Sequence, residues 1–94
     1  MRVRIRFFTT LREITGKRED TADLPDGTTV GDLLNLLSTR YGREFANYLY
    51  DEETGVHNYL QILINGNSIT TLQDQKTELK DGDTLAIIPP VGGG

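Results

Sequence analysis

The sequence contains no cysteine, and this absence removes several classes of protein at once. Without cysteine there is no disulfide, thiolate metal site, iron–sulfur cluster or cysteine nucleophile, so a ferredoxin is excluded from the small folds of this length. Histidine is scarce as well, since His57 is the single one. No second ligand lies near it in the sequence, which favours a solvated or structural side chain over a metal ligand or an acid–base catalyst.

Long hydrophobic runs are also missing, and no segment has the length needed to span a membrane. The first six residues alternate charged and apolar side chains, which is not the pattern of a signal peptide. We therefore expect a cytoplasmic protein without a membrane partner. With 36% hydrophobic and 26% charged residues, the 94-residue chain is expected to form one globular domain with one modest core.

Positive charge is in short supply outside the first 18 residues. Those residues hold six arginines and lysines against Glu13 alone, a local charge of +5, so the remainder carries −9 to reach the net charge of −4. An acidic body argues against nucleic acid as the main partner. The arginine strip formed by Arg2, Arg4 and Arg6 is interpreted as a solvated outer face or as a surface that docks an acidic protein. A nucleic-acid binder would instead show affinity that falls steeply with salt.

The first half of the chain carries clear local signals. Residues 2–8 alternate as a strand that buries Val3, Ile5 and Phe7, and residues 9–15 predict a short helical turn that ends at Gly16. Residues 21–24 are expected to form an edge strand in a hairpin with the first. After a Pro-Asp-Gly turn, Thr29 is a candidate helix N-cap with Asp32 in a capping box. The following amphipathic helix is expected to end at Gly42, and its apolar stripe consists of Val30, Leu33, Leu34, Leu37 and Tyr41.

The second half is less regular. Phe45, Tyr48 and Leu49 predict a further turn of helix, whereas residues 51–55 predict an exposed loop. Residues 60–64 form a compact apolar strand that ends at an Asn-Gly turn, and residues 69–72 predict a short strand or a bend. Leu79 is expected in the core. A turn over residues 80–83 then leads into the final strand, residues 84–88.

These elements predict an α+β fold of the β-grasp type, in which a mixed four- to five-stranded sheet wraps across one main helix. A single helix of about three turns must cover one face of the sheet to bury its stripe. The first and last strands are expected to pair in the centre of the sheet. We expect the β-grasp domain to cover residues 1–90 and a flexible glycine tail to cover residues 91–94.

The tail is the part of the sequence most indicative of function. Pro89 and Pro90 end the last strand and hold the chain extended, and Val91 is followed by Gly92, Gly93 and Gly94. Four extended residues reach about 13 Å, and glycine can enter a slot that a side chain would block. The alternative is a frayed terminus, where small residues often collect. The tail directly follows a strand and two prolines, which favours a functional terminus that carries its carboxylate into another protein's active site.

The whole pattern resembles the ubiquitin-fold sulfur carriers of the molybdopterin synthase small subunit (MoaD/ThiS) family, together with the small archaeal modifier proteins. The resemblance covers nearly the whole chain. It is carried by residues 4–8, Leu11-Arg12-Glu13, residues 29–34, Asn65-Gly66, residues 79–83 and the ending Pro89-Pro90-Val91-Gly92-Gly93-Gly94. Gly92 departs from the pattern, because the family often has a slightly larger small residue there, but the terminal Gly-Gly pair is intact.

The resemblance implies a carrier that acts through Gly94. An activating enzyme would use ATP to adenylate the Gly94 carboxylate, and a persulfide donor would then convert it to a thiocarboxylate. The acceptor of the sulfur would be a pterin precursor or a tRNA base. In the modifier role, the activated carboxylate would instead be joined by an isopeptide bond to a lysine of a target protein. The implied partners are the activating enzyme and either the large subunit of molybdopterin synthase or target-protein lysines. No cofactor is expected to be bound, and the chain would be a cosubstrate rather than an enzyme.

The resemblance also implies roles for individual residues. Gly92 and Gly93 would thread the tail into the partner, and Phe8, Ile88 and Val91 would form an apolar partner-binding patch. Phe8 could equally pack under the following loop. The alternative function is a β-grasp protein-interaction module whose glycine tail is inert. The Asp51-Glu52-Glu53 loop is interpreted as solvated charge, as adjacent carboxylates in a loop usually are. Lys17, Lys76 and Lys80 are candidate self-conjugation sites, but nothing in the sequence favours one of them.

Overall fold

The structure is a computed structural model that describes residues 1–51, 55–57 and 59–89. Its elements in chain order are β1 (Arg2–Phe7), α1 (Thr10–Thr15), β2 (Glu19–Asp23), α2 (Val30–Tyr41), α3 (Arg43–Leu49), β3 (Tyr50–Asp51), β4 (Gly55–Val56), β5 (Gln61–Ile64), β6 (Asn67–Ser68), the 3-10 helices η1 (Ile69–Thr71) and η2 (Asp74–Lys76), and β7 (Thr84–Ile88). None of the helices in these ranges combines the length and the apolar character needed to cross a membrane.

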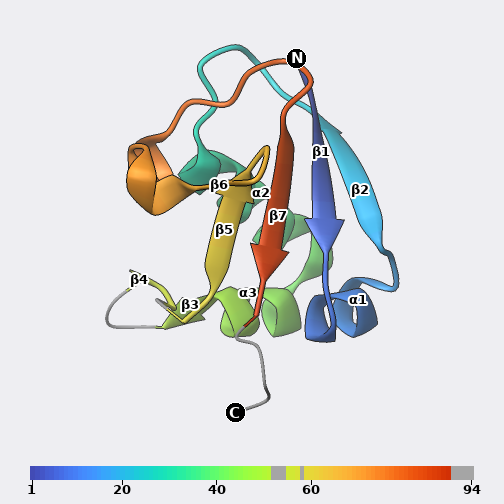
Figure 1. Ribbon diagram of the computed structural model, residues 1–94. Helices are drawn as coiled ribbons and strands as arrows, with labels where there is room; N and C mark the ends of the chain where they lie inside the picture. The colour runs from blue at the N-terminus through green and yellow to red at the C-terminus, as the bar shows by residue number, and fades with distance from the viewer. Residues whose placement is uncertain (52–54, 58, 90–94) are drawn as a thin grey trace.

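The main sheet has five strands in the order β2-β1-β7-β5-β6, so the first and last long strands lie together in its centre (Figure 1). They run parallel, with Ile5 opposite Leu85 and Phe7 opposite Ile87, whereas β2 and β5 flank them in antiparallel pairing. The predicted central pairing is therefore confirmed. Because β1 and β7 point the same way, the chain leaves both strands at the same end of the sheet, the lower end in Figure 1.

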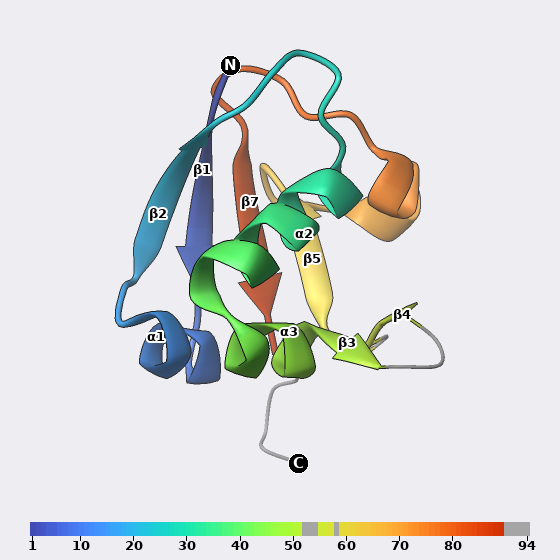
Figure 2. The ribbon, with the colours of Figure 1, turned by 180° about the vertical axis from the view of Figure 1, so that it is seen from behind.

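Helix α2 crosses one face of this sheet, as the rear view shows (Figure 2). Its residues Val30, Leu33, Leu34 and Leu37 are fully buried, which confirms the predicted stripe. The sheet meets them with fully buried side chains of the two central strands, namely Val3, Ile5, Phe7, Leu85 and Ile87. The strict alternation of burial along β1 leaves Arg2, Arg4 and Arg6 on the opposite face, which no helix covers in Figure 1.

The start of α2 is set by local hydrogen bonds. The Thr29 hydroxyl accepts from the Asp32 amide at 3.2 Å, and the Asp32 carboxylate accepts from the Thr29 amide at 3.1 Å. This reciprocal arrangement satisfies two amides that the first turn would otherwise leave unpaired, and it confirms the predicted capping box. The helix ends at Gly42, whose φ of 94° is a conformation that favours glycine.

In the second half, the strand alternative for residues 69–72 and the loop assignment of residues 51 and 55 were wrong. Residues 69–72 do not form a strand: the Ser68 hydroxyl accepts from the Thr70 amide, which favours a 3-10 turn and lets Ile69 turn into the core. The predicted loop over residues 51–55 contains two strand residues instead. Asp51 in β3 pairs with Gly55 in β4, while residues 52–54 lie outside the described ranges. The additional helical turns, α1 and α3, are confirmed.

The Asn-Gly and Asp-Gly-Asp motifs meet at the end of the sheet where β7 begins. Asn65 and Gly66 both have positive φ, 50° and 87°, as a two-residue hairpin turn between β5 and β6 requires. The side-chain nitrogen of Asn65 donates to Asp83 at 2.9 Å, and the side-chain oxygen of Asn65 accepts from the backbone amide of Thr84 at 2.9 Å. Asp83 is buried and also accepts from the Lys80 amide. These motif residues therefore fix the start of β7 next to β5, which is a structural role.

A polar network ties β2 to the end of α2. One oxygen of Asp20 accepts from the Tyr41 hydroxyl and, at 2.8 Å, from Arg40, while the other accepts from the Thr21 amide at 2.8 Å. Partial burial disfavours the charged form of Asp20, but these donors outweigh it and lower its pKa below the ordinary value. Burial and the neighbouring carboxylate raise the pKa of Tyr41 to about 12, so its hydroxyl remains a donor at neutral pH.

We expect Asp20→Asn to destabilise the fold by about 1–2 kcal/mol at pH 7, because charged hydrogen bonds at a mostly buried group are lost. A carboxylate with a lowered pKa stabilises the native state above its unfolded pKa, and this contribution is lost as pH falls through the native pKa. Urea unfolding should therefore show a smaller difference between variant and parent near pH 2.5 than at pH 7. The exposed Asp26 gives a matched control, Asp26→Asn, with no such difference; a pH-independent loss in Asp20→Asn would contradict the role of charge.

Candidate functional site

The candidate site begins where β1 and β7 end together. The register places Phe7 opposite Ile87, so Phe8 and Ile88, one position further along each strand, are neighbours at this end of the sheet. Phe7 and Ile87 point into the core with no exposed area, and the alternation therefore puts Ile88 on the face opposite α2. Both Phe8 and Ile88 are half-buried, and the half-buried Pro89 follows directly. The predicted pair thus stands at the root of the tail.

Two arginines flank the ring of Phe8. The guanidinium carbons of Arg6 and Arg12 each lie 5.5 Å from the ring centroid, within the range of a cation–π contact. Arg12 is held in place by a hydrogen bond of 3.1 Å from its Nε to the carbonyl oxygen of Phe7. The ring is therefore partly covered by charged side chains from β1 and from α1, the segment that follows Phe8.

The apolar surface extends across the sheet from this pair. Ala86 lies opposite Leu63 on β5 and opposite Arg6 on β1, and both Ala86 and Leu63 are half-buried while their strand neighbours are core residues. We define the open-face patch as Phe8, Leu63, Ala86 and Ile88. Leu63 was not predicted, because every residue from 60 to 64 except Gln61 is apolar and the sequence shows no alternation that assigns its face.

The arginine strip divides into two parts with different surroundings. Arg2 pairs with Asp23 at 3.0 Å and Arg4 approaches Glu19 at 3.9 Å, so the outer part of the strip is balanced by exposed carboxylates of β2. Arg6 and Arg12 take part in no ion pair within the described part of the chain. Positive charge that is not balanced nearby therefore borders the open-face patch at Phe8.

The remaining predicted site residues have different outcomes. Val91, Gly92, Gly93 and Gly94 lie outside the described residues, so their roles stay predictions. His57 stacks on Tyr59 with ring centroids 4.7 Å apart, and no group of three or more potential metal ligands occurs among the residues that the structure covers. Arg12 is a residue whose position the sequence did not predict, although the Leu11-Arg12-Glu13 motif pointed to its neighbourhood.

Comparison with known proteins assigns this chain to a family. The family model described as the ThiS family matches residues 5–94. The chain belongs to the ThiS family. This match includes the second half of β1, all of β7 and the glycine ending, so it covers both the residues of the open-face patch and the tail that follows them.

Individual relatives of this ThiS-family protein are similar over most or all of their length. It is 35% identical to small archaeal modifier protein 3 of Haloferax volcanii over 94 residues, which is 100% of both chains. It is 34% identical to the molybdopterin synthase sulfur carrier subunit of Drosophila yakuba, covering 98% of this chain and 90% of that protein. The crystal structure of SAMP1 from Haloferax volcanii superimposes with a TM-score of 0.87 at 26% identity, with 100% of both chains covered. The ubiquitin-like β-grasp fold predicted from the sequence is confirmed.

Proposed function

We propose that this ThiS-family protein is a ubiquitin-like modifier and sulfur carrier that acts through the carboxylate of Gly94. The observation that carries the proposal is the family match, which continues through the glycine ending to residue 94. Relatives that are similar over most or all of their length are named as a small archaeal modifier protein and as sulfur carrier subunits of molybdopterin synthase. The protein is a carrier and cosubstrate for partner enzymes rather than a catalyst.

The proposed chemistry activates a carboxylate in two steps. An oxygen of the Gly94 carboxylate attacks the α-phosphate of ATP, pyrophosphate leaves, and an acyl-adenylate forms. The terminal sulfur of a persulfide then attacks the acyl carbon and AMP leaves, and a second thiol reduces the resulting acyl disulfide to a thiocarboxylate. In the modifier role, a target lysine captures the activated acyl group with loss of its leaving group. Both routes need an unhindered carbonyl carbon, which glycine provides.

The fold supports this role by holding the root of the tail. Strand β7 is paired with β1 up to Ile87 and with β5 up to Ile88. A partner that binds the open-face patch therefore meets a rigid surface from which the tail starts. The activating enzyme would bind ATP and supply any metal and acid–base groups, so no bound cofactor is proposed for this chain. The further partners are a molybdopterin synthase large subunit or lysines of target proteins, and the cytoplasmic location stays a prediction.

The test is the intact mass of the protein after incubation with ATP, a sulfur donor and its cognate activating enzyme. The expected result is a mass shift equal to the exchange of one oxygen for sulfur, mapped by fragmentation to Gly94. If the enzyme is active and binds the protein, but no shift appears, the carrier proposal is wrong. The protein would then be a β-grasp interaction module with an inert tail.

We further expect Phe8→Ala to weaken binding to the activating enzyme about thirtyfold, which corresponds to a hot-spot loss of about 2 kcal/mol. The reason is that Phe8 is the largest side chain of the open-face patch and stands beside the root of the tail. Binding can be measured by titration calorimetry. Leu36→Ala removes a side chain that is 37% exposed on α2, which covers the other face, and it should bind like the parent protein. Equal affinities for all three proteins would exclude the patch as the interface.

A further inference from the structure

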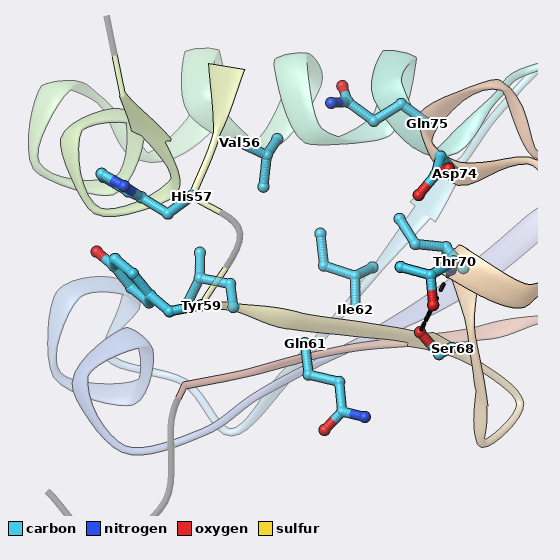
Figure 3. A pocket seen from close by; sticks show the side chains of 11 residues that line it. Val56, His57, Tyr59, Gln61, Ile62, Ser68, Thr70, Asp74 and Gln75 are labelled. Atoms are coloured by element: carbon cyan, nitrogen blue, oxygen red, sulfur yellow. Dashed lines mark hydrogen bonds between the residues drawn. The ribbon is translucent and has the colours of Figure 1, made fainter. Parts of the chain in front are cut away.

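A second surface feature lies at the side of the molecule, apart from the open-face patch, and His57 is among the residues that line it. A cavity of about 520 Å³ opens between β4, the start of β5 and the two 3-10 helices (Figure 3). This volume lies within the range typical of pockets that bind small molecules. We call it the side cavity. It forms only in the folded chain, because its walls come from three segments separated by turns.

The lining of the side cavity separates into an apolar floor and a polar rim. Leu60, Ile62 and Ile69 are almost completely buried and, with Val56, provide the floor. The polar rim residues are His57, Tyr59, Gln61, Ser68, Thr70, Asp74 and Gln75. In Figure 3 the rings of His57 and Tyr59 lie at one end, and Asp74 and Thr70 lie at the other with Ile62 between them. A ligand that fits this arrangement needs an apolar stem and a polar end group.

The polar end of the cavity favours a cation. Asp74 is the one carboxylate among the described residues that line it, and no lysine or arginine is among them. Asp74 also takes part in none of the ion pairs within the described part of the chain, in contrast to Glu19, Asp20 and Asp23. The hydroxyls of Ser68 and Thr70 lie 2.8 Å from each other, so one hydroxyl hydrogen is engaged between them while oxygen lone pairs remain for a donor.

The position of the cavity relates it to the open-face patch. Gln61 lines the cavity and is also the register partner of Ile88, which belongs to the patch. The cavity and the patch therefore both adjoin β5, so one bound protein can contact both. This continuity, together with the unbalanced negative charge, indicates what occupies it.

We propose that the side cavity binds a lysine or arginine side chain of the protein that engages the open-face patch. The aliphatic stem packs on Ile62 and Ile69, and the cationic group meets Asp74 and the hydroxyl oxygens of Ser68 and Thr70. At the other end, the exposed ring of Tyr59 stacks on His57 and adds an aromatic surface to the cavity. The identity of the protein that presents this side chain rests on the proposed function. The preference for a cation rests on the residues of the cavity alone.

The cavity can be tested with two small probes that differ by one terminal ammonium group. Nα-acetyl-lysinamide and Nα-acetyl-norleucinamide have similar stems, but only the first carries an ammonium group. In a ¹⁵N-labelled sample, we expect millimolar lysinamide to shift the amide signals of Ile62, Ile69, Thr70 and Asp74. Asp74→Asn should weaken this binding about three- to tenfold, and added salt should weaken it in the parent protein. Asp74 has a φ of 51°, a conformation that asparagine also tolerates, so this variant keeps the backbone.

Asp26→Asn is the matched control, since it removes the same charge from an exposed turn far along the chain from the cavity, and it should bind lysinamide like the parent. Norleucinamide that binds as tightly as lysinamide, an Asp74→Asn variant that binds like the parent, or an absence of shifts would each overturn the cation site. The activating enzyme gives the second arm: Asp74→Asn should raise the concentration needed for half-saturation about threefold. An unchanged value would overturn the assigned occupant. The mass-shift experiment does not depend on Asp74, so failure here is distinguishable from failure of the carrier chemistry.

Discussion

Deleting Gly94, or adding one residue after it, is expected to lower the rate of thiocarboxylate formation by at least about a hundredfold. The reacting carboxylate must reach the α-phosphate of ATP in one geometry, and misplacement by as little as about 1 Å can cost a hundredfold. One residue changes the reach of an extended tail by about 3.3–3.6 Å. The measurement is the time course of the oxygen-to-sulfur mass shift, with the activating enzyme and sulfur donor held constant.

The same tail variants provide their own control for folding. The strand that precedes the tail ends at Ile88, and its pairing with β1 and β5 does not involve Gly94. Deletion or extension should therefore leave the urea midpoint unchanged, and binding through the open-face patch should persist. A tail-extended variant that is still activated at the parental rate would contradict the carrier function, whereas a variant that has lost stability would show that the tail contributes to the fold.

Replacement of Phe7 by alanine is expected to destabilise the protein by about 3–5 kcal/mol, a large part of the stability of a domain of this size. Phe7 has no exposed area, and its ring makes edge-to-face contacts with Tyr41 at 5.6 Å and with Phe45 at 6.0 Å. The ring therefore joins β1 to α2 and α3. Its removal leaves a cavity among three elements that are held by other contacts and cannot close around it. Urea unfolding at pH 7 measures the loss.

Phe8→Ala is the natural comparison, because it makes the same chemical change one residue along the chain. Phe8 is half-buried, and its ring contacts the two arginines rather than the core, so we expect it to cost about 1 kcal/mol of stability or less. The two variants should then lose different properties: Phe7→Ala should lose stability, whereas Phe8→Ala should lose affinity for the activating enzyme. Equal destabilisation by both would show that the assignment of the two sheet faces is wrong.

The side cavity illustrates what could not be predicted locally. Its floor residues were expected in a strand or left without a role, and Asp74 was not singled out. Ile69 was placed in a strand or bend, and the 3-10 turn that brings it into the cavity depends on the Ser68 hydroxyl. The Asp20 network has the same character: its partners Arg40 and Tyr41 are 20 and 21 residues away, and none of the three is unusual in its own segment.

The sequence by itself determined the elements whose signals are local. The alternation of β1, the capping box and apolar stripe of α2, the Asn-Gly hairpin turn and the last strand each depend on neighbouring side chains, and all are confirmed. Tertiary structure alone decided which face Leu63 presents, which arginines border Phe8, how β3 pairs with β4 and where the side cavity opens. These features depend on register and on contacts between distant segments, and such contacts form only after the chain has met the entropy cost of closing long loops.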